Sequence, residues 1–224
     1  MTFLHILDIS GSVIVGNFAL AMMANEYGAQ AWSFNLLTIV IPATFLPVYN
    51  DYFAMAGYLH GTVSTNSVPA TVEEMHSFFA GGRIAPPEDH FGIKIILCQG
   101  PTIWANVDDA LSTALTSFVT PSGLFCAYPQ LTFNQYTLSM NRHPTYATLY
   151  SHHLFGYDLH LSNEDWQIPC GSLCLSVYRC IYESFSVLPF RQDNSTLVYL
   201  HLDTWWRIQT NCTNLACPFQ GTYI

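Results

Sequence analysis

The sequence predicts an α+β fold with a mixed or antiparallel sheet, a few helices, and a strand-rich, cysteine-rich C-terminal part. The chain has 224 residues, enough for one large domain, and 50% of them are apolar. Strand-like and helix-like segments alternate irregularly along it, which favours α+β over a regular doubly wound sheet. Five of the seven cysteines follow residue 169. We expect a main domain over residues 1–165 and a strand-rich extension over residues 166–224, either separate or part of the same domain.

The elements of the first hundred residues are predicted from hydrophobic periodicity and from residues that end helices and strands. Small apolar residues predict a helix over Ser12–Asn25, and an aliphatic run ended by proline predicts a buried strand over Leu36–Ile41. Alternation with a period of two predicts a strand over Gly57–Ser64. A capping-box pattern predicts a short helix over Thr71–Phe79. Phe91–Cys98 is apolar throughout except for one lysine, so a strand is expected there.

The elements of the second half are predicted in the same way. An N-terminal asparagine cap and an apolar stripe predict a helix over Val107–Phe118. Strands are expected over Leu124–Phe133, Gln135–Met140, Tyr157–Ser162 and Thr196–Leu202.

The chain is unusually poor in charge. Asp, Glu, Lys and Arg make up only 9% of the residues, Lys94 is the sole lysine, and the net charge is -9. A protein that binds long duplex nucleic acid needs a basic surface, which six Lys and Arg residues do not readily build. A small anionic ligand held by hydroxyls, histidines and backbone amides is compatible with this composition. The shortage of charge favours a virus-encoded protein, a membrane-associated one, or a subunit whose surface is covered.

Two charge-free stretches raise the question of a membrane. They run over Ile9–Asn25 and Tyr27–Asn50, and glycine, asparagine and proline interrupt them without flanking Lys or Arg. We expect buried core elements, with membrane association as the alternative. Because the first residues lack the basic start of a signal peptide, a cytoplasmic, reducing compartment is expected. The acceptor patterns for glycosylation at Asn194 and Asn211 are then incidental.

The C-terminal cysteines allow three interpretations. Zinc ligation, disulfides and buried free thiols all fit the sequence, and an odd total leaves at least one thiol unpaired within the chain. The spacing is not that of a standard zinc finger or ribbon. We therefore expect buried thiols, no metal and no cofactor. The residues that would supply metal ligands are Cys170, Cys174, Cys180, Cys212, Cys217 and the pair His152 and His153.

Histidines with strand spacing supply the candidate catalytic groups. His60 precedes Thr62 by two residues and His160 precedes Ser162 by two, so each imidazole shares a strand face with a hydroxyl. Two such strands side by side would surround a phosphate. One imidazole would accept a proton, the other would donate one, and the hydroxyls would hold the phosphoryl oxygens. This chemistry requires no metal.

With these motifs the chain resembles the 2H phosphoesterase (LigT-like) family over Gly57 to Phe133. The resemblance lies in an His-x-Thr strand and in the order of elements up to the segment Tyr128–Phe133. In the family that segment typically reads Pro-His-x-Thr, and Gln130 stands here where the second histidine would be, followed by Thr132. Gln cannot transfer a proton, so this register implies weak or absent activity. The other register uses His160 and Ser162 and departs from the family spacing.

The resemblance implies a phosphodiesterase, or an inactive relative, that acts on or binds small nucleotides or oligonucleotides. The alternative is a non-enzymatic accessory or interaction protein of the kind that viruses encode. Trp205, Trp206 and Arg207 form an aromatic and basic run typical of protein interfaces, so a protein partner is expected there.

Overall fold

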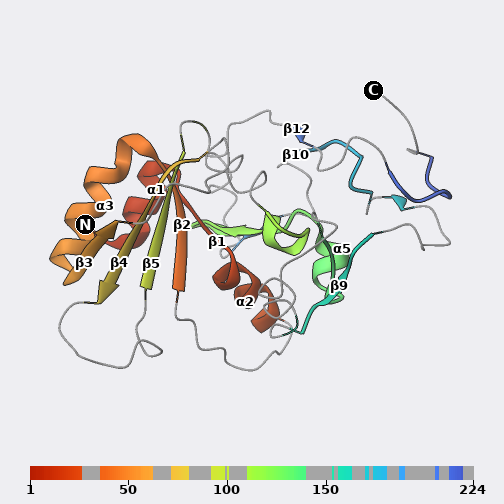
Figure 1. The fold of residues 1–224 in the computed structure, drawn as a ribbon, viewed down its shortest axis with the longest axis horizontal. Helices are drawn as coiled ribbons and strands as arrows, with labels where there is room; N and C mark the ends of the chain where they lie inside the picture. Colours follow the sequence, from red (N-terminus) through yellow and green to blue (C-terminus); the bar gives the residue numbers. More distant parts are fainter. Residues whose placement is uncertain are drawn as a thin grey trace.

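The protein is built around one mixed sheet of eight strands (Figure 1). The computed structural model describes residues 1–26, 36–62, 72–80, 92–98, 100, 110–139, 153, 156–162, 170–171, 174–180, 187–189, 205–206 and 212–218. Its sheet has the strand order β11-β7-β6-β1-β2-β5-β4-β3. The predicted α+β class with a mixed sheet and a few helices is therefore confirmed.

The helical elements are short. They are α1 (Phe3–Ser10), α2 (Asn17–Glu26), η1 (Ala43–Phe45), α3 (Leu46–Met55), η3 (Ala114–Thr116) and α5 (Pro129–Thr132). The strands are β1 (Val13–Val15), β2 (Leu36–Pro42), β3 (Tyr58–Thr62), β4 (Val72–Ala80), β5 (Gly92–Cys98), β6 (Phe118–Val119), β7 (Gly123–Phe125), β8 (Tyr136–Leu138), β9 (Asp158–His160), β10 (Arg179–Cys180), β11 (Val187–Pro189) and β12 (Trp205–Trp206).

One parallel pair makes the sheet mixed. β2 runs parallel to β5, whereas β5, β4 and β3 follow one another antiparallel. On the other side β1 pairs antiparallel with β2 and β6, and β6, β7 and β11 continue antiparallel. β11 comes from the predicted C-terminal extension and joins this sheet. Two small sheets stand apart from it, β8 with β9 and β10 with β12.

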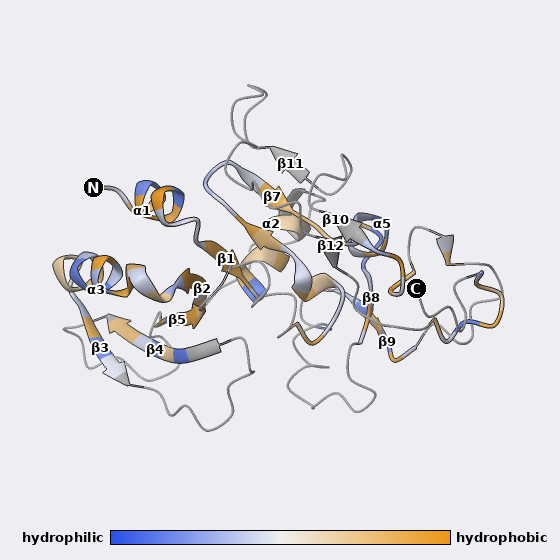
Figure 2. Cartoon of the chain, turned by 90° about the horizontal axis from the view of Figure 1, so that it is seen from above, coloured by the Kyte–Doolittle hydropathy of each residue, from blue (hydrophilic) through white to orange (hydrophobic). Residues whose placement is uncertain are grey.

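The core lies between the sheet and the helices on one of its faces. Figure 2 shows α1 and α3 along one side of the strands β2 to β5. Phe53 of α3 is buried, and its ring centre lies 5.0 Å from that of Phe78 and 5.7 Å from that of Tyr58. Aliphatic residues of β2 and β5, such as Ile39 and Ile95, are fully buried in the same cluster. Hydrophobic burial on this face therefore fixes the register of β3, β4 and β5.

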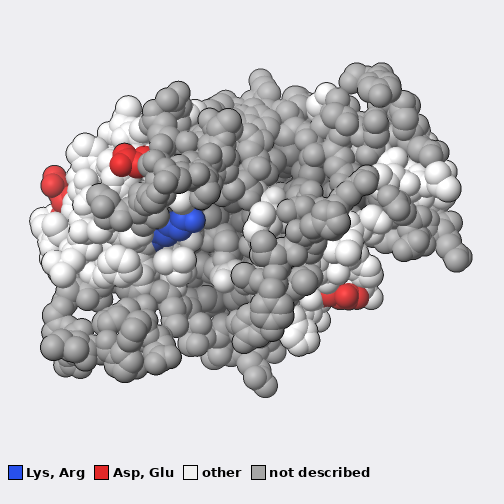
Figure 3. Space-filling model, in the orientation of Figure 1, with Lys and Arg blue, Asp and Glu red and all other residues white. Residues whose placement is uncertain are grey.

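Hydroxyl groups take the place of charges in the interior. Ser10 Oγ lies 2.6 Å from Ser12 Oγ and 3.2 Å from the hydroxyl of Tyr49, and all three side chains are buried. Thr113 and Thr137 form a second buried pair, with their Oγ1 atoms 3.1 Å apart. Acidic and basic side chains are sparse on the described part of the face drawn in Figure 3. The described part of this face is therefore as poor in charge as the sequence.

Four of the five elements predicted in the first half agree with the structure, and one does not. Strands at β2, β3 and β5 are confirmed, as is a helix near residues 17–25, although Val13–Val15 precedes that helix as a strand. The helix predicted over Thr71–Phe79 is wrong where the structure describes it, since Val72–Ala80 is a strand. Pairing on both sides, with β3 and β5, overrides the local helix-capping pattern.

The second half departs further from expectation. The predicted helix ending at Phe118 is wrong in its described part, which holds only a single turn at Ala114–Thr116 before Phe118 enters β6. The strand predicted over Leu124–Phe133 ends at Phe125, and Pro129 begins the short helix α5. β8 and β9 confirm two predicted strands, and Thr196–Leu202 lies outside the described residues. None of the helices in the described part of the chain is both long and apolar enough to cross a bilayer.

Candidate functional site

The two histidines expected to act together lie on different sheets. His60 is on β3, the last strand of the large sheet, and His160 is on β9, which pairs only with β8 among the described strands. β3 and β9 lie toward opposite ends of the long axis in Figure 1. The structure therefore does not bring His60 and His160 to one phosphate-sized site, which two-histidine acid–base chemistry requires.

The residues of the second register lie near His160 rather than near His60. Gln130 and Thr132 belong to α5, which leads directly into β8, the partner of β9. Gln130 is exposed, whereas Thr132 is buried with no hydrogen-bond partner for its Oγ1 atom. Ser162 follows β9 and is partly buried. The side chain of Thr62 lies outside the described part of the structure.

His60 instead contacts a second histidine that sequence reasoning missed. His60 Nε2 lies 2.8 Å from Nδ1 of His76, which is on β4 and only 6% exposed. The ring centres are 5.1 Å apart and the rings are inclined by 22°. Since each nitrogen is about 1.2 Å from its ring centre, this separation places both nitrogens on the line joining the centres, as in a linear N–H···N hydrogen bond.

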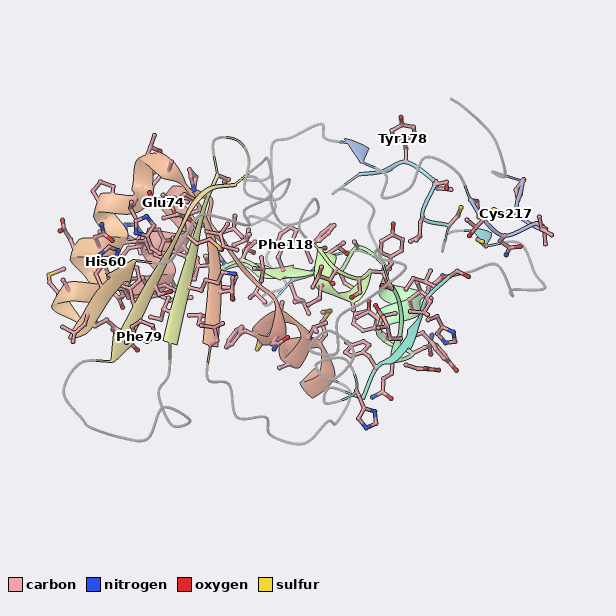
Figure 4. The ribbon with its side chains drawn as sticks, in the orientation of Figure 1. His60, Glu74, Phe79, Phe118, Tyr178 and Cys217 are labelled. Carbon is pink, nitrogen blue, oxygen red and sulfur yellow. The ribbon has the colours of Figure 1, made fainter. Side chains whose placement is uncertain are left out.

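Glu74 extends this contact, so three titratable groups follow one another on one sheet face. Its Oε2 atom lies 3.2 Å from His76 Nε2, within ion-pair range but without hydrogen-bond geometry. Figure 4 shows His60 and Glu74 at the same end of the molecule. The hydrogen bond between the two imidazoles engages one nitrogen of each, so His60 has only Nδ1 to offer another group. Glu74, His76 and Phe78 alternate with a period of two, which indicates a strand with these three side chains on one face. The helix predicted over this segment gave no reason to place His76 beside His60.

His160 has a local partner of a different kind. Its Nε2 atom lies 3.1 Å from Oδ2 of Asp158 on the same strand, and its ring faces that of Tyr136 with centres 5.6 Å apart. Asp158 and His160 are both accessible to solvent. An exposed pair of this type contributes little to stability, and it gives His160 a carboxylate as its acid–base neighbour instead of a second imidazole.

Four of the C-terminal cysteines come together in one buried cluster. The Sγ atoms of Cys170, Cys174, Cys212 and Cys217 all lie within 4.8 Å of one another. All four residues are at most 4% exposed, and Val177 packs against them. Burial raises the pKa of the Cys170 and Cys174 thiols to about 12, and contact with Cys212 contributes to both shifts. Without a cation, these thiols are therefore protonated at neutral pH.

The remaining predicted ligands lie elsewhere. Cys180 is on β10, and its side chain lies outside the described part of the structure, whereas His153 is exposed and is not in the cluster. His152 lies outside the described residues, as does Arg207 of the predicted interface run. Trp205 and Trp206 form β12, whose partner is β10.

A third feature is the outer edge of the large sheet at β3. Leu59 on this strand is 65% exposed, and in the sheet it pairs directly with Phe79 of β4, which is 50% exposed. Phe79 pairs with Gly92 and Gly92 with Leu36, which is 49% exposed. Directly paired residues share a sheet face. Leu59, Phe79 and Leu36 therefore form one exposed apolar row, on the face opposite α3, which we call the apolar row.

Gly61 shapes this row. The Phe79 ring leans over Gly61, since a β-carbon there would lie 3.2 Å from Phe79 Cε2.

No family model matches the chain, and no curated protein is significantly similar to it. Three features of the described structure are candidates for a function: the histidine pair, the four-cysteine cluster and the β3 edge.

Proposed function

We propose that this protein is a non-enzymatic interaction protein that associates through the outer edge of its large sheet. The observation that carries the proposal is the β3 strand, Tyr58–Thr62, which ends the sheet and contains neither proline nor charge. An edge strand exposes backbone N–H and C=O groups that another strand can pair with. Among the described residues, no further strand pairs with β3 on its outer side.

The opposite edge of the same sheet supplies the internal comparison. β11 is three residues long and ends at Pro189, which cannot donate a hydrogen bond to another strand. Short edge strands, proline and lysine are the devices by which proteins prevent edge-to-edge pairing. β11 has two of these devices and β3 has none. The contrast supports β3, rather than β11, as the edge that accepts a partner.

The apolar row supports the same assignment. Leu59 lies on the edge strand itself, so a strand added beside β3 would cover part of its side chain and extend the row. An exposed apolar group next to an open edge marks a site of association.

A second copy of this chain is the partner that fits the edge best. Two β3 strands that meet antiparallel at His60 would set Leu59 opposite Gly61 of the second copy, beside the Phe79 ring that leans over that glycine. The strand carries no charged residue, so its two copies do not repel each other at the contact. The pairing would give one continuous sheet across both copies.

Sedimentation velocity over a range of protein concentrations tests this proposal. The wild-type chain is expected to dimerise as its concentration rises, and Leu59→Lys to remain monomeric, since lysine on an edge strand opposes pairing. Leu4→Lys is the matched control, because Leu4 is equally exposed but lies on α1, away from the edge. A wild-type chain that is monomeric at every concentration, or a dimer that Leu59→Lys leaves intact, would overturn the proposal.

The two-histidine phosphodiesterase remains a separate prediction with its own test. Cleavage of a 2′,5′- or 3′,5′-linked dinucleotide in the presence of EDTA, lost on His60→Ala and on His160→Ala alike, would support it against the interaction proposal. General acid–base catalysis predicts a loss of at least roughly 10²-fold in each variant. Since His60 and His160 lie on different sheets, we expect no cleavage.

A further inference from the structure

The four-cysteine cluster has the dimensions of a tetrahedral metal site. Zinc bound by four thiolates has Zn–S bonds of about 2.3 Å, which places the sulfur atoms about 3.8 Å apart. Cys170 Sγ lies 3.6 Å from Cys212 Sγ, and Cys217 Sγ lies 3.7 Å from Cys174 Sγ. All remaining pairs are within 4.8 Å. Four sulfur atoms mutually this close occupy the corners of a compact tetrahedron.

Two disulfides explain the arrangement less well. A disulfide requires its sulfur atoms about 2.05 Å apart, and both close pairs are well beyond that distance. Two independent disulfides also give no reason for the cross pairs to approach within 4.8 Å. A cluster of thiols without a cation explains the convergence no better, because thiols are weak hydrogen-bonding groups that hold one another only loosely.

We propose that Cys170, Cys174, Cys212 and Cys217 bind one structural Zn²⁺ ion as thiolates. Their spacing, Cys-x₃-Cys followed by Cys-x₄-Cys, falls within the two to four intervening residues common between paired zinc ligands. The four ligands complete the tetrahedron and leave no position for water or substrate, so the ion has a structural role. Cadmium or cobalt would fit the same soft ligand set.

Neighbouring groups hold the ligands in place. The buried Asn214 donates a hydrogen bond from Nδ2 to Cys170 Sγ over 3.3 Å, and its Oδ1 accepts one from the amide of Ala216 over 2.8 Å. The amide of Cys217 donates to the carbonyl oxygen of Asn214. A site of four thiolates and one Zn²⁺ carries a net charge of -2, so N–H donors to sulfur stabilise it. Asn214 is thus a positioning residue.

The ion would join two segments that are distant in the sequence. Cys170 and Cys174 meet Cys212 and Cys217 at this cluster, and the small core described here consists of the four cysteines and Val177. Such a small apolar core supplies little stability by itself, whereas structural zinc contributes folding free energy directly. Figure 4 shows Cys217 at the far end of the molecule from His60, so this site is independent of the β3 edge.

Metal analysis of the 224-residue chain, purified under reducing conditions without chelator, tests the proposal. We expect about one zinc per chain in the wild type, and close to none in Cys217→Ser. Cys98→Ser is the matched control, because Cys98 is a buried cysteine on β5 of the large sheet, and the variant should keep its zinc. A wild type without zinc after refolding with zinc present, or a folded Cys98→Ser variant that loses it, would overturn the proposal.

If Cys217→Ser fails to fold, cobalt spectroscopy of the wild type tests the proposal instead. Co²⁺ added to the metal-free wild type should give intense tetrahedral d–d bands and a thiolate charge-transfer band. Cys217→His retains a ligand that zinc accepts, so it should bind Co²⁺ with shifted d–d bands. A spectrum of octahedral Co²⁺ in the wild type would overturn the proposal. The proposal would also be overturned if mass spectrometry found the disulfides Cys170–Cys212 and Cys174–Cys217 in freshly purified wild type.

Discussion

The large sheet and the cysteine-rich end of this protein are stabilised by different means. In the sheet, long apolar side chains such as Phe53, Phe78 and Ile95 are buried between strands and helices. At the C-terminal end, the described core is four cysteines with one valine packed against them. Hydrophobic burial scales with apolar area, whereas a tetrahedral cluster needs only four correctly placed ligands. The Zn²⁺ ion that we propose would therefore stabilise an end whose described cluster holds four cysteines and one valine.

The largest expected effect comes from removing the metal that we propose. Structural zinc contributes about 10–16 kcal/mol of apparent binding free energy in zinc-finger peptides. We expect a strong chelator to make residues 170–180 and 212–218 accessible to proteases, while the amides of β2 and β5 stay protected from hydrogen exchange. Equal loss of protection in both regions would show that they are not stabilised separately.

A substitution in the sheet should produce the opposite pattern. Phe78 is 1% exposed and packs on Phe53, so Phe78→Ala should lower the free energy of unfolding by about 3–5 kcal/mol. The neighbouring Phe79 is half exposed, and Phe79→Ala should cost at most about 1 kcal/mol. Denaturant titration of the sheet measures both. The zinc content of both folded variants should equal that of the wild type. Loss of zinc in Phe78→Ala would show that the sheet and the cysteine cluster are not stabilised independently.

The positioning residue of the cluster should have an intermediate effect. Asn214→Ala removes an N–H donor to Cys170 Sγ, and loss of such a partner typically weakens metal binding by about 10–100-fold. Competition with a chromophoric zinc chelator measures this change. Asn134→Ala is a suitable control, since Asn134 donates to a backbone carbonyl on α5 outside the cluster. An unchanged zinc affinity in Asn214→Ala would mean that the amide has no role in holding the site.

The smallest effect concerns the buried hydroxyls of the sheet region. Burial raises the pKa of Tyr49, while hydrogen bonds to Ser10 and Ser12 oppose the shift. Because the folded pKa exceeds the unfolded value of 10.0, this stabilising contribution is complete below pH 10 and is lost as the pH rises further. Tyr49→Phe should cost about 1 kcal/mol at neutral pH and reduce the alkaline loss of stability. An identical alkaline profile in Tyr49→Phe, measured by denaturant titration, would contradict this assignment.

Some of the fold could be predicted because local sequence and tertiary environment agree. β2 and β5 are short apolar runs rich in β-branched residues, and that length and composition favour a buried strand over a helix. Segment 72–80 shows the reverse case. The first residues of this segment match a helix cap, but its side chains also alternate as in a strand. The segment is a strand because it pairs with β3 on one side and with β5 on the other. Local patterns are weak where both periods fit, and pairing then determines the structure.

The candidate sites divide in the same way. The sequence alone determined the low charge, the α+β class and the presence of histidines and cysteines with the chemistry to form sites. Which of them meet was decided by the tertiary structure. His60 contacts His76 because β3 and β4 are adjacent, and His160 is on another sheet. Cys212 and Cys217 join Cys170 and Cys174, although Cys212 follows Cys170 by 42 residues. Contacts between distant segments depend on strand order and chain path, which spacing along one chain does not encode.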